Sequence, residues 1–367
     1  MSIKIDRDAL LKPLVSVSGI VERRHTLPIL SNLLLEAKQD KLSITATDLE
    51  MQISLSVEKI GDEELSTTIS AKKLLDICRS LPESSEINLI PQEGRIQLKA
   101  GKSRFNLQTL PATDYPVMTS APGSATTVVR IGQNKLKNLF KKVEFAMAQQ
   151  DIRYYLNGLL FEINENKINL VGTDGHRLSF ITTTLEESYE KQELILPRKT
   201  VVELCKLLGD DESELVIEIR AGQIKFNLGQ IKLISKIIDG KFPDYSRVIP
   251  SSSLNSFTID RKSILFSMQR VSILSYEKLR GIRLILNENN LKLISTNNEQ
   301  EEAEEELEID YVGDCLDMGF NVTYIIDVLN NIENEKITFN FTNASSSCLI
   351  TIPDNDDYKY VVMPMRI

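Results

Sequence analysis

The sequence has few of the residues and runs that membrane proteins and many enzymes depend on. No apolar run approaches the roughly 20 residues that a membrane span requires, and 26% of the residues are charged. The chain holds only two histidines and four cysteines. Residues 1–6 lack the basic start and apolar core of a signal peptide. We therefore expect a soluble protein of the cytoplasm with no membrane partner.

The scarce cysteines and histidines argue against a disulfide framework and against triad catalysis. Cys78 and Cys205 occupy matching places in two apolar helical stretches, where a small buried thiol is usual. Asp174 and His176 could suggest a general base, but His25 is the only other histidine. No serine or cysteine nucleophile motif accompanies them. We expect structural or pocket roles for this pair.

A second motif with a catalytic look is Gly101-Lys102-Ser103, which resembles the end of a phosphate-binding loop. The glycine that this loop needs five positions earlier is Ile96, and the flanking segments are strands. The motif is therefore expected to be a hairpin turn. We expect no catalytic residue, no metal site and no cofactor.

The chain repeats itself three times. Helical stretches open at Ile5-Asp6-Arg7, Ile131-Gly132-Gln133 and Ile259-Asp260-Arg261. Strand-like segments later end at Ala46-Thr47-Asp48, Gly172-Thr173-Asp174 and Ser295-Thr296-Asn297 in the same order. A period of this length is the size of a domain. Three domains are predicted, at residues 1–122, 123–252 and 253–367.

Each repeat predicts a helix, several strands, a short helix and more strands. The apolar spacing favours long helices over 6–21, 133–148 and 261–274, and short helices over 71–81, 197–208 and 322–331. The strands alternate as in antiparallel sheets, and polar linkers fall at 119–127 and 250–256. The fold class is therefore α+β, with helices gathered on one face of antiparallel sheets.

The charge distribution separates the helices from the rest of the chain. The net charge is -9, which argues at first against a nucleic-acid partner. However, Lys and Arg outnumber Asp and Glu over 6–24, 71–81, 132–150, 197–208 and 260–280, whereas the sixth helical segment, 320–331, has more acidic than basic residues. Helix propensity alone would collect Glu equally. A basic helical surface of this kind suits duplex DNA, because Lys and Arg can neutralise its phosphates without contacting its bases.

Seven segments, spread over all three repeats, resemble one family closely: TLPILSN (26–32), TDLEM (47–51), QDIRYYLNG (150–158), TDGHRL (173–178), FPDY (242–245), NEQEEAEE (298–305) and YVVMPMRI (360–367). They are similar to the bacterial DNA polymerase III beta subunit, the sliding clamp. The resemblance covers the chain from end to end.

This resemblance implies a fold and a mechanism. Two copies would join head to tail into a ring of six DNA-clamp domains, with two helices of each domain inside and the sheets outside. Duplex DNA would pass through the ring, independent of its sequence. The ring would tether the alpha subunit of the replicative polymerase at high effective concentration. A separate clamp-loader ATPase would open it.

The resemblance also assigns residues to DNA contact at one face of the ring: Arg24, Gln150, Tyr154, Tyr155, Arg198 and Lys199. If Tyr154 and Tyr155 lie in a strand, they face opposite sides, so one of them reaches the surface and can stack on a base. For Arg198 and Lys199, a solvated helix end is nearly as good an interpretation.

A hydrophobic cleft between the second and third domains is implied as the site for a short linear peptide of polymerases, the clamp loader and repair proteins. The matching residues are Leu156, Thr173, Gly175, His176, Arg177, Leu178, Pro243, Arg247, Val248, Ser347, Val361, Met363, Pro364, Met365 and Arg366. Met363 and Met365 support this directly, because flexible thioethers suit a pocket for varied side chains. Ser345 departs from the aliphatic residue often found there in related clamps.

For the contact between copies, the resemblance implies that Phe105 and Leu107 meet Ile273 and Leu274 of the other copy. A basic set would face an acidic one. The basic set is Lys73, Arg95 and Arg104, and the acidic set is Glu299, Glu301, Glu302, Glu304 and Glu305. Opposite charges on two edges favour the correct pairing.

From the residues alone, two other classes of protein stay open. One is a metal-dependent nuclease or other nucleic-acid enzyme on an acidic scaffold. The other is a simple peptide-binding adaptor.

Overall fold

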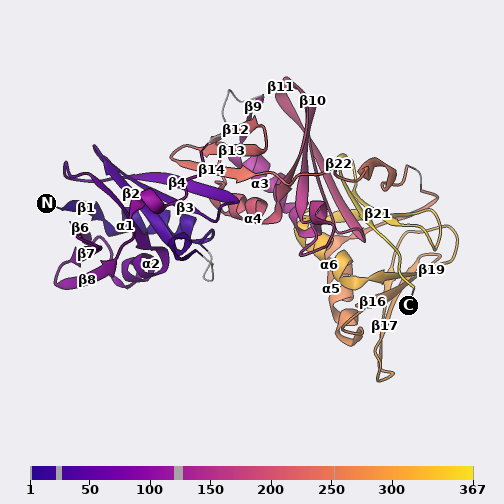
Figure 1. Ribbon diagram of the computed structural model, residues 1–367. Helices are drawn as coiled ribbons and strands as arrows, with labels where there is room; N and C mark the ends of the chain where they lie inside the picture. Colours follow the sequence, from indigo (N-terminus) through magenta and orange to yellow (C-terminus); the bar gives the residue numbers. More distant parts are fainter. Residues whose placement is uncertain (1, 22–26, 120–126, 252, 367) are drawn as a thin grey trace. The chain divides into compact units, whose positions relative to one another are not determined.

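The structure is a computed structural model that describes residues 2–21, 27–119, 127–251 and 253–366. It divides into two compact units (Figure 1), each described here by itself. Unit 1 holds residues 1–137 and 202–237, and unit 2 holds 138–201 and 238–367. Most of the linker predicted at 119–127, and part of the one at 250–256, lies outside the described residues.

Unit 1 contains two antiparallel sheets. The smaller has the order β1 (Ile3–Asp6), β6 (Glu86–Gln92), β7 (Arg95–Ala100) and β8 (Ser103–Gln108). The larger has the order β5 (Leu65–Ser70), β2 (Asn32–Lys38), β3 (Lys41–Thr47), β4 (Met51–Glu58), β14 (Ile231–Lys236), β13 (Gln223–Leu228), β12 (Glu214–Arg220) and β9 (Thr127–Gly132). Strands of the first and second repeats thus share one sheet, joined where β4 pairs with β14.

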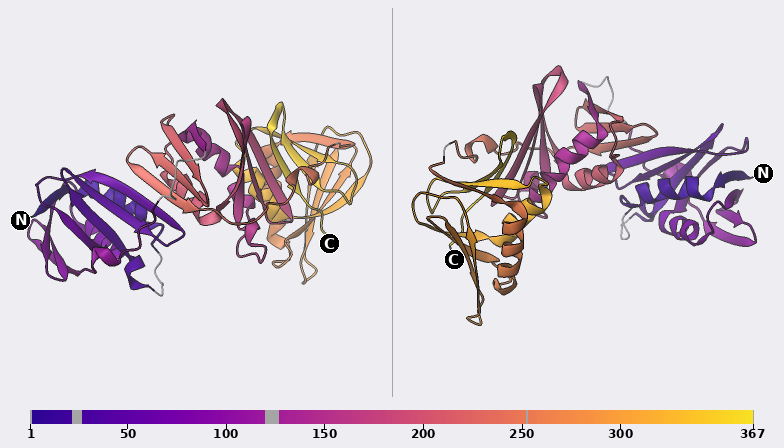
Figure 2. Two further views of the ribbon diagram at one scale, coloured as in Figure 1. Left: turned by 45° about the horizontal axis from the view of Figure 1, so that its top comes forward. Right: turned by 180° about the vertical axis from the view of Figure 1, so that it is seen from behind.

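Unit 2 also contains two antiparallel sheets. The larger has the order β10 (Gly158–Thr173), β11 (Arg177–Pro197), β22 (Asn355–Val362), β21 (Cys348–Ile352), β20 (Lys336–Phe341) and β15 (Asn255–Asp260). The smaller has the order β18 (Glu302–Glu308), β17 (Asn290–Thr296), β16 (Gly281–Asn287) and β19 (Leu316–Asn321). Here the second and third repeats join where β11 pairs with β22. The long β10 and β11 run side by side (Figure 2).

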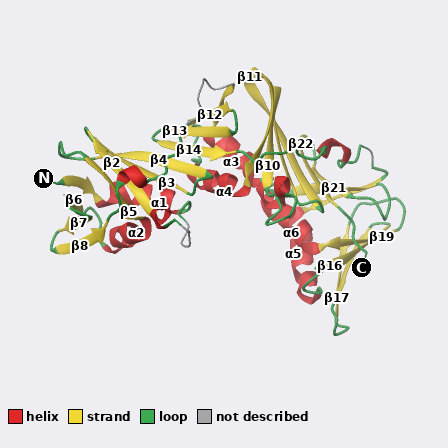
Figure 3. Ribbon diagram, in the orientation of Figure 1, coloured by secondary structure: helices red, strands yellow, loops and turns green. Residues whose placement is uncertain are grey.

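The described residues form six α-helices (Figure 3): α1 (Arg7–Ser18), α2 (Ala71–Ser80), α3 (Gln133–Lys141), α4 (Arg198–Leu207), α5 (Arg261–Val271) and α6 (Val322–Asn331). The repeated sequence openings explain where they begin. The carboxylate of Asp6 accepts hydrogen bonds from the backbone N–H of Asp8 and Ala9, and Asp260 accepts one from Ser263. Ser70 caps α2 through the backbone N–H of Lys73.

Helices and sheets bury the core as the apolar spacing requires. In α1, the buried residues are Leu10, Leu14 and Val17, and this helix packs on β3 and β4 and beside α2. In α5, the buried residues include Ile264, Leu265 and Met268, and this helix packs on β17 and β18. The predicted α+β class with antiparallel sheets is confirmed. None of the described helices is both long and apolar enough to cross a membrane.

The long helices are shorter than predicted. The helix expected over 133–148 ends at Lys141 and is followed by a 3-10 turn, η3 (Glu144–Ala146). Distant side chains bond the carbonyls of the segment after Lys141: Ser179 donates to Lys142, Arg177 to Phe145, and Arg198 to Glu144 and Met147. The helix expected over 261–274 likewise ends at Val271 and continues as η6 (Ser272–Leu274).

Candidate functional site

An apolar cleft of about 170 Å³ opens in unit 2, beside the joined strands β11 and β22. Leu178 and Val361 are direct partners across these strands, and both are buried. The cleft is lined by Arg153, Tyr155, Leu156, Thr173, Gly175, Arg177, Leu178, Phe242, Pro243, Tyr245, Val248, Val361 and Met363. Its lining is mostly apolar, with a few polar groups at defined places, as is usual for ligand sites.

One wall of the cleft is an aromatic side chain held from behind. The ring of Tyr245 stacks on Phe180 with 5.7 Å between centroids. Its hydroxyl donates a hydrogen bond of 2.7 Å to Oε2 of Glu162, whose side chain also accepts from Asn169. Burial and the neighbouring Glu162 raise the pKa of Tyr245, so the phenol stays a donor. The wall is therefore fixed in position before a ligand arrives.

A tight turn at Thr173–Arg177 forms the next part of the lining. The hydroxyl of Thr173 donates to the carbonyl of Arg177 at 2.6 Å and accepts from the backbone N–H of Gly175. Oδ1 of Asp174 accepts from the backbone N–H groups of His176 and Arg177. Thr47 and Asp48 make the corresponding bonds in the first repeat. The turn is therefore part of the repeated fold.

Gly175 marks what is special about this copy of the turn. Its φ is +88°, a left-handed conformation, and a Cβ there would lie 2.8 Å from Nη1 of Arg153. Arg153 is held over the turn by Asp151, which accepts from its Nε and Nη2, and by the carbonyl of Asp174. The bonds to Arg153 lower the pKa of Asp151 to about 2. The close approach of the guanidinium requires a glycine.

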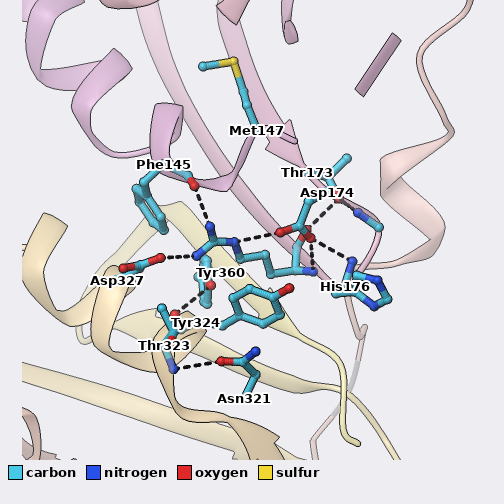
Figure 4. Close-up of polar contacts among 12 residues, drawn as sticks. Phe145, Met147, Thr173, Asp174, His176, Asn321, Thr323, Tyr324, Asp327 and Tyr360 are labelled. Carbon is cyan, nitrogen blue, oxygen red and sulfur yellow. Dashed lines mark hydrogen bonds and ion pairs between the residues drawn. The ribbon is translucent and has the colours of Figure 1, made fainter. Parts of the chain in front are cut away.

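Arg177 lines the cleft and also contacts residues that do not line it, among them Asp327 and Phe145, which Figure 4 labels. Its guanidinium donates to Asp174 at 3.1 Å, to Asp327 at 2.5 Å and to the carbonyl of Phe145 at 2.7 Å. It also lies over the ring of Tyr324, 4.5 Å from the centroid. Burial disfavours its charge, but the adjoining carboxylates outweigh burial and raise the pKa of Arg177. This side chain is charged and fully engaged.

The C-terminal segment is held at two points by its backbone. The N–H of Met363 donates to the carbonyl of His176, and the N–H of Met365 donates to the carbonyl of Gly319. Val361 and Val362 are buried, whereas the side chain of Met363 is exposed at the cleft. The tail is thus partly core and partly lining.

Nine of the fifteen residues predicted for the cleft line it: Leu156, Thr173, Gly175, Arg177, Leu178, Pro243, Val248, Val361 and Met363. The other six do not line this cavity: His176, Arg247, Ser347, Pro364, Met365 and Arg366. Pro364, Met365 and Arg366 line a separate, more polar hollow together with Ser345. Arg247 is bonded to Asp244 at 2.8 Å.

The sequence prediction missed Arg153, Phe242 and Tyr245, and assigned Tyr155 to DNA only. The FPDY segment contains two of these residues, so its aromatic side chains were a usable signal. Arg153 could not be assigned to the cleft from the sequence, because its side chain is positioned by the bond to Asp151 and by the space that Gly175 leaves open.

The residues predicted for DNA contact lie in different settings. Arg24 falls outside the described residues. Tyr154 and Tyr155 lie in a 3-10 turn, η4 (Tyr154–Leu156), so the strand assumed for them is wrong. Tyr154 is nevertheless 58% exposed, while Tyr155 packs against the apolar cluster of the cleft. Gln150 is exposed, with φ at +57°.

Arg198 and Lys199, the remaining candidates for DNA contact, begin α4. Nη1 of Arg198 donates to the carbonyls of Glu144 and Met147, both at 3.2 Å. Arg198 thus holds the segment at and after η3, a role that neither the phosphate nor the solvated interpretation included. Lys199 is half-buried.

The residues predicted for contact between copies lie in or near two edge strands, β8 and β18. Arg104, Phe105 and Leu107 belong to β8, the edge of the small sheet of unit 1, and Arg95 lies on β7 beside it. Lys73 is exposed on α2. Within the described residues, Lys73, Arg95 and Arg104 form no ion pair.

The acidic candidates gather at β18, the edge of the small sheet of unit 2. Glu302, Glu304 and Glu305 are in this strand, and Glu299 and Glu301 precede it. Glu304 pairs with Lys292 at 2.5 Å, and Glu305 pairs with Arg270. Close by, Ile273 in η6 is 77% exposed and Leu274 is half-buried.

The described residues contain no group of three or more His, Cys, Asp or Glu side chains placed like metal ligands. Asp174, the carboxylate considered as a general base, is used by the turn and by Arg177.

Comparison with known proteins identifies the fold. Models of the N-terminal, central and C-terminal domains of the DNA polymerase III beta subunit match residues 1–119, 130–244 and 246–366. A beta sliding clamp from Pseudomonas putida is 45% identical over 369 residues, covering 100% of both chains. The crystal structure of the DNA polymerase III subunit beta from Pseudomonas aeruginosa is 45% identical, with a TM-score of 0.96 over 100% of both chains. A further structure of that protein, bound to griselimycin, is 44% identical, also with a TM-score of 0.96 over 100% of both chains.

Three clamp domains in succession define a DNA-clamp protein. The chain belongs to the DNA polymerase III beta subunit family. Its function is that of a sliding clamp, the processivity factor of DNA replication.

Proposed function

We propose that two copies of this clamp close head to tail into a ring around duplex DNA, in the cytoplasm and without catalysing a reaction. In this proposal the apolar cleft of each copy takes a short peptide segment of the replicative polymerase alpha subunit, of the clamp-loader ATPase, and of other polymerases and repair proteins. The observation that carries the ring is the way in which successive repeats join.

Both joints within the chain follow one rule. The strand after the Thr47-Asp48 turn, β4, pairs with β14, the last strand of the second repeat. The strand after the Thr173-Asp174 turn, β11, pairs with β22, the last strand of the third repeat. The strand after the corresponding Thr296-Asn297 turn is β18, which is an edge strand of its sheet within the described residues. The last strand of the first repeat, β8, is likewise an edge strand. Joining β18 of one copy to β8 of another applies the rule a third time.

The register of this pairing is taken from the first joint, between β4 and β14. Ser54 lies two residues after the partner of Thr47 in β4, and Glu304 lies two residues after the partner of Thr296 in β18. Ser54 and Glu304 therefore hold corresponding places in their strands. The opposite strands are β14, which follows the turn at 229–230, and β8, which follows the turn at 101–102. The corresponding place in each strand is the second residue after its turn.

Those second residues are Lys232 in β14 and Arg104 in β8. Lys232 is the direct partner of Ser54 within the chain. Glu304 of one copy should therefore face Arg104 of the other. Directly opposite side chains of unlike charge stabilise a strand pair by roughly 0.2–1 kcal/mol, and like charges destabilise it.

A second contact is predicted in the same way. The third residue of α6, Tyr324, lies under Arg177, the first residue of β11. The third residue of α2 is Lys73. The residue that corresponds to Arg177 is Glu301, because it precedes the partner of Thr296 by one position. Lys73 and Glu301 should thus form an ion pair between copies.

Side chains at the cleft support peptide binding. The flexible side chain of Met363 can adapt to different ligands. The ring of Tyr245, which its hydrogen bond holds in place, provides a rigid surface in the same cleft. Exposed Tyr154 and Gln150 offer stacking and hydrogen bonding to a nucleic-acid strand. The domain boundaries that we propose remain 1–122, 123–252 and 253–367, which the three matched ranges support.

The test is retention on DNA of different topology. The clamp is loaded by a clamp-loader ATPase onto nicked circular DNA, which is then cut once. Retention on the circle with loss after cutting supports a ring, and equal retention on both would leave only a peptide-binding adaptor. Turnover of DNA or ATP by the pure protein with magnesium would instead indicate a nucleic-acid enzyme.

A further inference from the structure

Arg177 connects the cleft to elements that do not line it. Two of its neighbours, Asp327 and Tyr324, belong to α6, and a third, Phe145, belongs to η3. The ring of Phe145 lies 5.8 Å from that of Tyr360, whose hydroxyl donates to the carbonyl of Tyr324 at 2.8 Å. The cleft and α6 are therefore held by one shared set of contacts (Figure 4).

The backbone around Arg177 belongs to the same assembly. Arg177 pairs with Val362 in the joint between β11 and β22, and the N–H of Met363 bonds to the preceding residue, His176. Oδ2 of Asp174 accepts a hydrogen bond from the guanidinium of Arg177, and Oδ1 accepts one from the backbone N–H of Arg177 in the turn. Movement of Arg177 would consequently displace the turn and the tail, which both line the cleft.

The other joint within the chain has no ion pair at the places of Arg177 and Asp327, although an exposed pair, Lys236 with Glu50 at 3.1 Å, crosses it elsewhere. Met51 stands where Arg177 does, as the first residue of β4, and is only 1% exposed. Glu203 stands at the same place in α4 as Asp327 in α6, and its carboxylate pairs with Lys206 of its own helix. The joint between β4 and β14 is therefore made without a charged pair linking these two positions. Of the two joints, only the one beside the cleft has the pair.

We propose that Arg177 is a positioning residue of the cleft, and that its bond to Asp327 links occupation of the cleft to the packing of α6. This inference rests on the proposed function of the cleft as a ligand site. A ligand in the cleft would pack against the stem of Arg177, whose guanidinium is already fixed. Without Asp327, the buried cation loses a partner and turns toward other acceptors, so the cleft loses its shape.

The linkage must act in both directions. If α6 packing favours the ligand-ready position of Arg177, a bound ligand stabilises the packing of α6 by the same factor. Asp327 does not line the cleft, so any effect of its replacement on ligand affinity passes through Arg177.

The test uses griselimycin as the probe, because a solved structure of the Pseudomonas aeruginosa relative contains it. Its affinity is measured by calorimetry for the full-length wild type and for Asp327→Asn, Asp327→Glu, Arg177→Met and Leu178→Asp. Asp76→Asn is the matched control, since Asp76 holds the corresponding place in α2 and is exposed. Hydrogen exchange of residues 322–331 is followed with and without the probe.

We expect Asp327→Asn to weaken binding by about 2- to 30-fold, the range in which residues between linked sites act. Asp327→Glu should recover most of the affinity, and Asp76→Asn should leave it unchanged. The probe should slow exchange in α6 of the wild type, of Asp76→Asn and of Asp327→Glu, but not of Asp327→Asn. If Asp327→Asn folds poorly, Asp327→Glu with the exchange measurement carries the test.

The outcomes separate the two proposals. If wild type fails to bind, or if Leu178→Asp binds as well as wild type, the cleft is not the ligand site and the proposed function of the cleft fails. If those two behave as expected but Asp327→Asn binds like wild type and α6 exchange ignores the probe, the linkage alone is wrong.

Discussion

The hydroxyl of Tyr245 donates a hydrogen bond of 2.7 Å to Oε2 of Glu162, and this bond fixes an aromatic wall of the cleft. Glu162 is only 7% exposed, so its carboxylate depends on hydrogen bonds from the protein in place of water. The bond comes from two segments far apart in the sequence, and its removal is a direct test of how rigid the wall must be.

Replacing Tyr245 by Phe removes the donor and leaves the ring. Because a buried carboxylate then loses a partner, we expect the free energy of unfolding to fall by about 1–3 kcal/mol. Denaturant titration of wild type and variant measures this loss. Tyr189→Phe is the control, since the bond from Tyr189 to Glu187 is exposed and should be worth less. Equal losses in both variants would contradict the importance of the buried bond.

Gly175→Ala should damage the cleft more than an ordinary glycine replacement. The added Cβ meets both the left-handed φ of +88° and the guanidinium of Arg153. The backbone strain alone costs about 1 kcal/mol, and displacement of Arg153 adds to it. Gly101→Ala isolates the strain, because its φ is +55° and no atom lies within 4 Å. Thermal unfolding and griselimycin affinity are compared, and only Gly175→Ala should lose affinity.

Reversing the charge of Arg104 should separate the copies. Arg104→Glu places like charges opposite each other in the predicted pairing with Glu304, and we expect dimer dissociation to increase by about tenfold or more. Sedimentation equilibrium gives the dissociation constant. The double variant Arg104→Glu with Glu304→Arg should regain dimer, although it gives up the pair with Lys292. Lys41→Glu changes the same charge at an exposed site elsewhere, and should have no effect.

Acid should remove a stabilising contribution of Glu218. Burial opposes its ionisation, but hydrogen bonds from Arg220, Lys225 and Asn227 outweigh burial and lower its pKa from 4.5 to about 2. Because the folded pKa is the lower one, this contribution is complete above about pH 4.5 and disappears as the pH falls toward 2.

Glu218→Gln should therefore reduce the free energy of unfolding by about 1–3 kcal/mol at pH 7 and by much less near pH 3. Denaturant titrations of wild type and variant at the two pH values measure the difference. Glu214→Gln is the control, because its pair with Arg130 is exposed and contributes little. A deficit of Glu218→Gln that stays constant with pH would show that ionisation is not the cause.

Deleting Met363 to Ile367 should abolish binding of the polymerase alpha subunit and leave the dimer intact. The deletion removes a lining residue and the backbone bonds of Met363 and Met365, whereas the edges β8 and β18 lie elsewhere in the sequence. Pull-down of the polymerase and solution mass of the variant are the two measurements. Unchanged polymerase binding would reject the role of the tail.

Most of the fold was predictable because its signals are local. Alternating strands and the capped starts at Asp6, Ser70 and Asp260 are properties of neighbouring residues. The end of α3 was not predictable in this way. The carbonyls of the segment that follows α3 are taken by Ser179, Arg177 and Arg198, which lie 32 to 54 positions away in the sequence. Such bonds exist only once the chain has folded.

The cleft shows the same division. Leu178, Val361 and Pro243 were assigned through short segments that resemble a family, and the structure brings them together. Tyr245 and Arg153 were missed because each is placed by a partner, Glu162 or Asp151. Tyr154 was expected in a strand because no local signal distinguishes a 3-10 turn from an extended pair of aromatic residues.

In a ring of two copies, the joints within each chain and the joints between the copies would resist pulling unequally. The joint between β4 and β14 and the joint between β11 and β22 are each continuous ladders of backbone hydrogen bonds, backed by an unbroken polypeptide. A joint between β8 and β18 of two copies has no such covalent backing. Under tension, a ring built this way yields first at the seams between copies, and the same chain can then close again without refolding.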